Sequence, residues 1–144
     1  MLDISDIRRL KFDVLVIGAG HIGMLCIQAA KAAGASKIVV SEPSLRRREV
    51  AKSLGADVVI DSSDPDISKT IISATDNAGP DVVFECAAAP STLDLALDVV
   101  RRDGNVTLVA LAWRDVPIVP VKWAAKEISM LTTFGTEAKD WKIA

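Results

Sequence analysis

The stretch that decides the fold of this 144-residue chain is VLVIGAGHIG, residues 14–23. Its apolar first half predicts a strand that is buried on both faces, and its three glycines predict a tight turn into a helix. A second apolar run, residues 37–41, ends directly before Glu42. The carboxylate lies about 20 residues beyond the last glycine, which is the spacing of a dinucleotide-binding unit.

The same alternation of strand and helix continues along the chain. We predict strands at residues 13–17, 37–41, 57–60, 81–85, 105–110 and 128–133. Helices are predicted between them: one that ends at Gly34, one over residues 44–54, one that Asp64-Pro65 opens as cap and first residue, and one that begins near Pro90. The buried face of the first helix is predicted from residues at helical spacing, namely Ile22, Leu25, Cys26, Ala29 and Ala33.

This pattern predicts a single α/β domain, a doubly wound six-stranded parallel sheet with helices on both faces, the Rossmann fold. Residues 1–12 are expected to form a lead-in segment, residues 13–135 the dinucleotide-binding domain, and residues 136–144 a return helix that is cut short.

Composition excludes several classes of function. The net charge of −2 does not favour nucleic acid or an anionic membrane, and no apolar run approaches the length of a membrane span. The beginning of the chain does not resemble a signal peptide. The two cysteines, Cys26 and Cys86, form no CxxC pair, so we interpret them as reduced thiols of a cytoplasmic protein.

Each glycine of the motif has its own expected role. Gly18 allows the tight turn, Gly20 lets a pyrophosphate approach the backbone, and Gly23 lets the helix lie close to the sheet. The phosphates would then lie at the N-terminus of the helix. His21, the one histidine of the chain, either donates a hydrogen bond to phosphate there or has no role in binding.

Glu42 is expected to accept the two hydroxyls of the adenosine ribose and to repel a 2′-phosphate, which favours NAD over NADP. Three consecutive arginines, Arg46 to Arg48, follow it in the first turn of a helix, where each opposes the helix dipole by about 0.3–1 kcal/mol. At least one of them is therefore expected to contact the ribose or a 2′-phosphate. The alternative for Arg46 and Arg48 is a solvated basic face.

Two residues at the end of the fourth predicted strand are further candidates. Cys86 lies at the edge where doubly wound sheets bind ligands, and its alternative role is that of a small buried apolar residue. Glu85 beside it is a candidate buried acid without a sign of catalytic use. One histidine and two distant cysteines cannot form a zinc site, so no metal ligand and no catalytic residue is assigned in this chain.

Several segments together resemble the coenzyme-binding domain of the zinc-dependent medium-chain alcohol dehydrogenases, and in particular its polyol, butanediol and threonine dehydrogenase branch. They are VLVIGAGHIG at residues 14–23, AKAAGA at 30–35, AKSLGAD at 51–57, GPDVVFEC at 79–86 and KEI at 126–128. The resemblance covers roughly residues 10 to 144.

The resemblance implies a set of NAD-binding residues. The pyrophosphate would be bound by Gly18, Gly20, His21, Ile22 and Gly23, and the adenosine ribose by Glu42 and Arg47. Segments that line the nicotinamide half match Cys86, Ala87, Ala110, Leu111 and Phe134. The family also pairs subunits through the last strand of the sheet, so the resemblance implies a homodimer through residues 128–133.

Members of this family hold their zinc and substrate pocket in a separate catalytic domain, which this sequence does not contain. We therefore expect the chain to be the NAD(H)-binding domain of an oxidoreductase that transfers hydride between an alcohol or polyol and NAD, and to bind cofactor by itself without turnover. The alternatives are a free-standing nucleotide-binding or sensor module, an NADP-specific dehydrogenase domain, and a methyltransferase domain that binds S-adenosylmethionine.

Overall fold

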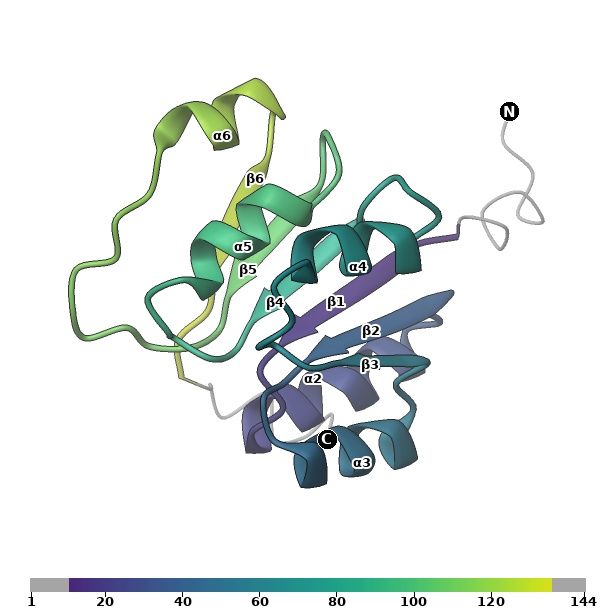
Figure 1. Ribbon diagram of the computed structural model, residues 1–144. Coiled ribbons are helices and arrows are strands. Elements are labelled where there is room, and N and C mark those ends of the chain that lie inside the picture. Colours follow the sequence, from purple (N-terminus) through teal and green to yellow (C-terminus); the bar gives the residue numbers. More distant parts are fainter. Residues whose placement is uncertain (1–10, 136–144) are drawn as a thin grey trace.

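Six parallel strands form one sheet in the computed structural model, which describes residues 11–135 (Figure 1). The strand order is β3-β2-β1-β4-β5-β6. The strands are β1 (Asp13–Ile17), β2 (Lys37–Ser41), β3 (Val58–Ile60), β4 (Val82–Glu85), β5 (Asn105–Leu108) and β6 (Ser129–Thr132). The predicted α/β class and the six-stranded parallel sheet are confirmed.

Helices cover both faces of this sheet. One face carries α2 (His21–Ala32) and α3 (Leu45–Leu54), and the other carries α4 (Ile67–Ala74) and α5 (Thr92–Val99), as Figure 1 shows. The short helix α6 (Pro120–Ala125) contacts α5 and leads into β6. Within residues 11–135, no helix has the length and apolar character needed to cross a membrane.

The side chains of β1 alternate between two cores, which explains its uninterrupted apolar sequence. Val14 and Val16 pack with Ile27 of α2 on one face. Leu15 and Ile17 belong to the other core, which α4 and α5 cover.

The order of the strands creates the position of a binding site. β1 pairs with β2 on one side and with β4 on the other, so the connections on its two sides run in opposite directions. Ligands of open α/β sheets bind at this reversal, outside the carboxyl ends of the strands. There β1 leads into the glycine turn, β2 into Glu42 and β4 into Cys86.

The predicted buried face of the first helix is wrong. The residues of α2 that are buried are Gly23, Ile27 and Ala30, whereas Ile22 and Leu25 are exposed by 38% and 61%. Cys26 is half-buried, and Ala29 and Ala33 are exposed. The glycine turn sets this rotation, because only Gly23 can lie directly against the backbone of Gly18.

Other boundaries differ as well. The third helix begins at Ile67, because Asp64 accepts the N–H of Asp66 in a preceding turn and does not cap the helix. Short helix α6 was not predicted. The strands predicted over 57–60, 81–85, 105–110 and 128–133 are each one or two residues shorter, whereas 13–17 and 37–41 are confirmed. The predicted return helix at 136–144 and nearly all of the lead-in segment at 1–12 lie outside the described residues.

Candidate functional site

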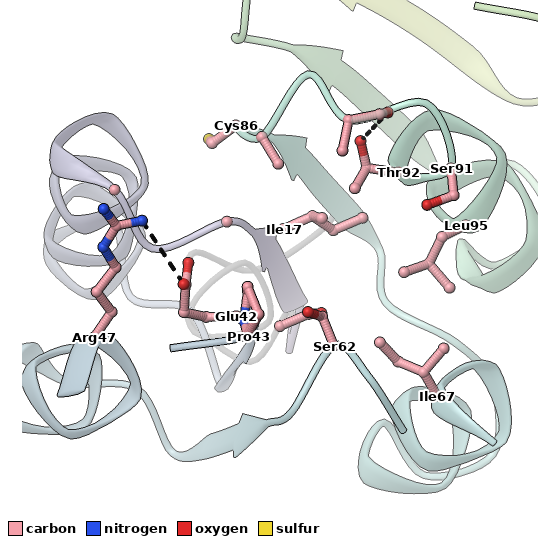
Figure 2. A pocket seen from close by; sticks show the side chains of 15 residues that line it. Ile17, Glu42, Pro43, Arg47, Ser62, Ile67, Cys86, Ser91, Thr92 and Leu95 are labelled. Atoms are coloured by element: carbon pink, nitrogen blue, oxygen red, sulfur yellow. Dashed lines mark hydrogen bonds and ion pairs between the residues drawn. The ribbon is translucent and has the colours of Figure 1, made fainter. Parts of the chain in front are cut away.

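A pocket of about 440 Å³ lies at the carboxyl ends of β1, β2, β3 and β4. Figure 2 shows Glu42 and Arg47 on one side of it and Ser91, Thr92 and Leu95 on the other. Six of the residues predicted from the sequence line this pocket, namely Gly18, Gly20, Glu42, Arg47, Cys86 and Ala87.

The glycine turn has the geometry that an anion site requires. Gly18 has a φ of 90°, a left-handed conformation that favours glycine, and its N–H donates to the Ser41 carbonyl at 2.8 Å. A Cβ at Gly23 would collide with the carbonyl oxygen of Gly18. A Cβ at Gly20 would meet no atom within 4 Å, so the space in front of this residue is open.

The N-terminus of α2 faces the same space without a side-chain cap. Gly20 is the N-cap residue and has no side chain that could accept the first N–H groups of the helix. The uncapped N–H groups and the helix dipole both favour a negative group at this position. His21 and Ile22 begin the helix, but neither they nor Gly23 line the pocket; both side chains are exposed, and Gly23 is buried.

Glu42 is a buried carboxylate with two backbone partners. Its side chain is only 3% exposed, its Oε2 accepts the N–H of Ala19 at 2.7 Å, and its Oε1 accepts the N–H of Ser44 at 3.0 Å. These bonds join the glycine turn to the start of α3. A carboxylate has about four acceptor positions, so two remain for hydroxyl donors in the pocket.

The arginines after Glu42 have different surroundings. The side chain of Arg47 is 58% exposed, lines the pocket, and has Nη1 at 3.8 Å from Oε1 of Glu42. Arg48 is only 14% exposed; its Nη1 donates to the carbonyls of Glu42 and Pro43, and its Nη2 pairs with Asp61 at 3.0 Å. The solvated face considered for Arg48 is therefore wrong, because this side chain holds the turn after β2. Arg46 is exposed.

The loop after β4 forms the wall opposite Glu42. Glu85 is buried, and its Oε1 accepts the N–H groups of Ala87 and Ala88 at 3.0 Å each. The acid considered in the sequence is thus a structural acceptor that shapes the loop. Cys86 is half-buried, and its thiol donates to Sγ of Cys26 at 3.8 Å.

That sulfur contact separates the properties of the two thiols. The hydrogen bond lowers the pKa of Cys26. The same bond, together with burial, raises the pKa of Cys86. Cys26 is therefore the thiol of the pair that ionises first.

A second, more open hollow of about 320 Å³ lies at the ends of β5 and β6. Ala110, Leu111 and Phe134 line it together with Trp113. Leu111 is exposed by 47%, Phe134 by 82% and Trp113 by 89%. The structure therefore divides nine of the twelve predicted residues between the pocket at β1–β4 and this apolar surface, and His21, Ile22 and Gly23 line neither.

Comparison with known proteins identifies the family. Residues 22–144 match the family described as zinc-binding dehydrogenase. The chain belongs to this family. It corresponds to the part of a zinc-binding dehydrogenase that binds the nicotinamide cofactor, which overturns the methyltransferase alternative.

Individual relatives agree with this assignment. L-threonine 3-dehydrogenase of Pyrococcus horikoshii is 46% identical over 98 residues, which cover 68% of this chain and 28% of the relative. The crystal structure of 2R,3R-butanediol dehydrogenase from Bacillus subtilis has a TM-score of 0.85 at 31% identity, over 94% of this chain and 39% of that one. A protein from Sinorhizobium meliloti 1021, described as a zinc-binding dehydrogenase and bound to NADP, has a TM-score of 0.79 at 29% identity, over 90% and 40%. The zinc-binding dehydrogenase chain described here thus spans well under half the length of these relatives.

The residues described at the pocket fit a nicotinamide dinucleotide. The hydroxyl of Ser41 is buried at the pocket and has no hydrogen-bond partner among residues 11–135, and Gly20, with open space in front of it, lines the same pocket. By contrast, no group of three or more histidine, cysteine or acidic side chains in the described part of this zinc-binding dehydrogenase is placed to hold a metal ion.

Sequence reasoning missed several polar residues of the pocket. They are Ser41, Ser62, Ser91 and Thr92. Ser41 ends β2, Ser62 follows β3, and the other two begin α5. Their signal was position alone: each lies just at or after the carboxyl end of a strand or at the start of the following helix.

Proposed function

We propose that this chain binds NAD(H) across the carboxyl edge of its sheet, with the pyrophosphate over Gly20 and the adenosine ribose at Glu42. The observation that carries the proposal is the position of Glu42, which is buried at the pocket wall and bonded to the N–H of Ala19 inside the glycine turn. The ribose carboxylate and the phosphate turn therefore form one rigid unit.

The preference for NAD rests on charge. A 2′-phosphate on the adenosine ribose would lie beside the Glu42 carboxylate, whose one ion-pair partner among the described residues is Arg47 at 3.8 Å. NADP is the second candidate, because Arg47 is largely exposed and free to turn toward a phosphate, and because one similar structure is bound to NADP.

Calorimetric titration with NADH and with NADPH at equal ionic strength tests the proposal. We expect NADH to bind at least about tenfold more tightly, which corresponds to about 1.4 kcal/mol. Arg47→Ala should weaken any NADPH binding more than NADH binding, and Arg46→Ala is the matched control at an exposed neighbouring position. Tighter binding of NADPH would contradict the NAD assignment, and binding of neither would contradict the function.

For the whole protein we propose hydride transfer between an alcohol or polyol and NAD. The names of the threonine and butanediol dehydrogenases among its relatives support this substrate class. When bound, the nicotinamide supplies or accepts the hydride, and the chain's own residues hold it in place. The chain by itself should form no NADH from NAD and alcohols in a spectroscopic assay. Turnover by the chain alone would contradict this part of the proposal. A reading frame without a catalytic domain would favour a free-standing nucleotide-binding module.

We also propose pairing of two copies through β6, whose residues are mostly exposed at the edge of the sheet. An exposed edge strand offers unpaired N–H and C=O groups to a second copy. Sedimentation of the chain and of Leu131→Lys should show a dimer that the substitution weakens; a monomer at all concentrations would contradict it.

We propose the cytoplasm as the location of the protein, because both of its cysteines are free thiols.

A further inference from the structure

The two cysteines of the chain are brought into contact by the fold, although 60 positions separate them. Cys26 lies on α2 and Cys86 in the loop after β4, with 3.8 Å between their sulfur atoms. Both are half-buried and free. They are also the two cysteines of the whole sequence, so a disulfide within the chain has a single connectivity.

One member of the pair belongs to the pocket and the other does not. Cys86 lines the pocket, and Figure 2 shows it on the loop above the end of β1. Its backbone lies against the glycine turn, since a Cβ at Gly18 would be 3.2 Å from the carbonyl carbon of Cys86. Cys26 packs against the core between α2 and the sheet.

We propose that Cys26 and Cys86 are an oxidisable dithiol that forms an intramolecular disulfide, and that this disulfide weakens the binding of the cofactor. The second half of the proposal rests on the proposed function.

Hydrogen peroxide is a sufficient oxidant for this step. The Cys26 thiolate attacks one peroxide oxygen, the O–O bond breaks, and a sulfenic acid and hydroxide form. The Cys86 sulfur then attacks the Cys26 sulfur, the S–O bond breaks, and the disulfide forms with release of a second hydroxide. The two thiol protons convert both hydroxides to water, so the dithiol loses two electrons and the peroxide gains them. The lowered pKa of Cys26 fits its role as the attacking thiol.

Closing the bond must move the pocket wall. A disulfide has a sulfur–sulfur distance of about 2.05 Å, so the two sulfurs must approach one another. The loop after β4 is short and its backbone contacts Gly18, so a shift of Cys86 toward α2 is transmitted to the turn that binds pyrophosphate. By linkage, bound cofactor must oppose disulfide formation by the same factor by which the disulfide weakens binding.

The test uses the full chain in three states: reduced, oxidised with dilute hydrogen peroxide, and reduced again with dithiothreitol. Peptide mapping of the oxidised chain should recover a linked Cys26–Cys86 peptide from monomer. NADH titration should show at least about tenfold weaker binding of the oxidised state and full recovery after reduction. Added NADH should slow the appearance of the linked peptide.

Cys26→Ala and Cys26→Ser are the controls, because residue 26 does not line the pocket. Both variants should bind NADH like the reduced chain, before and after the same peroxide treatment. Oxidation without a linked peptide would overturn the dithiol site, and a linked peptide with unchanged NADH affinity would overturn the coupling. If the reduced chain binds no NADH, the proposed function and the coupling both fail, and the linked peptide alone decides the dithiol site.

Discussion

The two halves of the sheet differ in how far their side chains are buried by the rest of the chain. β1 and β2 are buried along four of their five residues, and the carboxylate that follows β2 is satisfied by backbone donors. At the other side, three of the four residues of β6 are exposed, and Phe134 and Trp113 present large apolar surfaces to solvent. The side chains of the β1–β3 half are therefore packed within the chain, whereas the β5–β6 half has the apolar exposure typical of a contact surface.

Among changes in the β1–β3 half, the largest effect should come from Gly23→Ala. The added Cβ would collide with the carbonyl of Gly18, so the turn and α2 must separate, at an expected cost of about 3 kcal/mol in the free energy of unfolding. Gly20→Ala is the matched control, because its Cβ meets no atom within 4 Å. Urea unfolding should show a loss only for Gly23→Ala, and NADH titration a loss of affinity for Gly20→Ala. Equal stability of the two variants would contradict the packing of this turn.

Glu42→Gln should have the next largest effect. The glutamine amide can place its oxygen toward only one of the two N–H donors, from Ala19 and Ser44, and its NH₂ group faces the other. We expect a loss of about 2 kcal/mol in stability, since a buried donor loses its acceptor, together with weaker NADH binding. Glu49→Gln, at an exposed position on α3, should change stability by less than about 0.5 kcal/mol. If both variants unfold alike, Glu42 does not join the turn to α3.

In the β5–β6 half, removal of large apolar side chains should have little effect on stability. Phe134→Ser and Trp113→Ser should each change the free energy of unfolding by less than about 0.5 kcal/mol, because both side chains are more than four-fifths exposed. Leu97→Ala, in the buried core, should cost about 2–5 kcal/mol in the same thermal or urea experiment. A large loss for Phe134→Ser would show that this half is packed within the chain.

The smallest effect concerns the opposite end of the sheet. Burial raises the pKa of Asp13 above its usual value, so the folded chain holds this proton to higher pH than the unfolded chain does. That contribution is present below about pH 3.9 and is lost as pH rises through the raised pKa. Asp13→Asn should therefore be more stable than the original chain at pH 7, by less than about 1 kcal/mol, and the difference should shrink in acid. An Asp13→Asn variant that is less stable at pH 7 would contradict this account.

The sequence was sufficient where one local pattern determines the geometry. The apolar run before Gly18, the spacing of the glycines and the acid after β2 together predict the turn, the parallel pair and the place of Glu42 at the site. These features depend on neighbouring residues and on steric limits of the backbone.

Sequence reasoning failed where distant residues decide the outcome. The rotation of α2 depends on how close Gly23 comes to the Gly18 carbonyl, and not on the spacing of apolar residues within the helix. The low exposure of the Arg48 side chain was not recognisable from the sequence, because its partners are carbonyls of the turn and Asp61. The contact between Cys26 and Cys86 arises only when β4 is placed beside β1.

The measurement that tests the central claim most directly is an amide NMR titration of the labelled chain with NADH. The account predicts that the largest shifts appear at Gly18–Gly23 and at Glu42–Ser44, in the β1–β3 half. Largest shifts at residues 108–112 and 132–134, with the glycine turn unchanged, would contradict it, as would the absence of any shift.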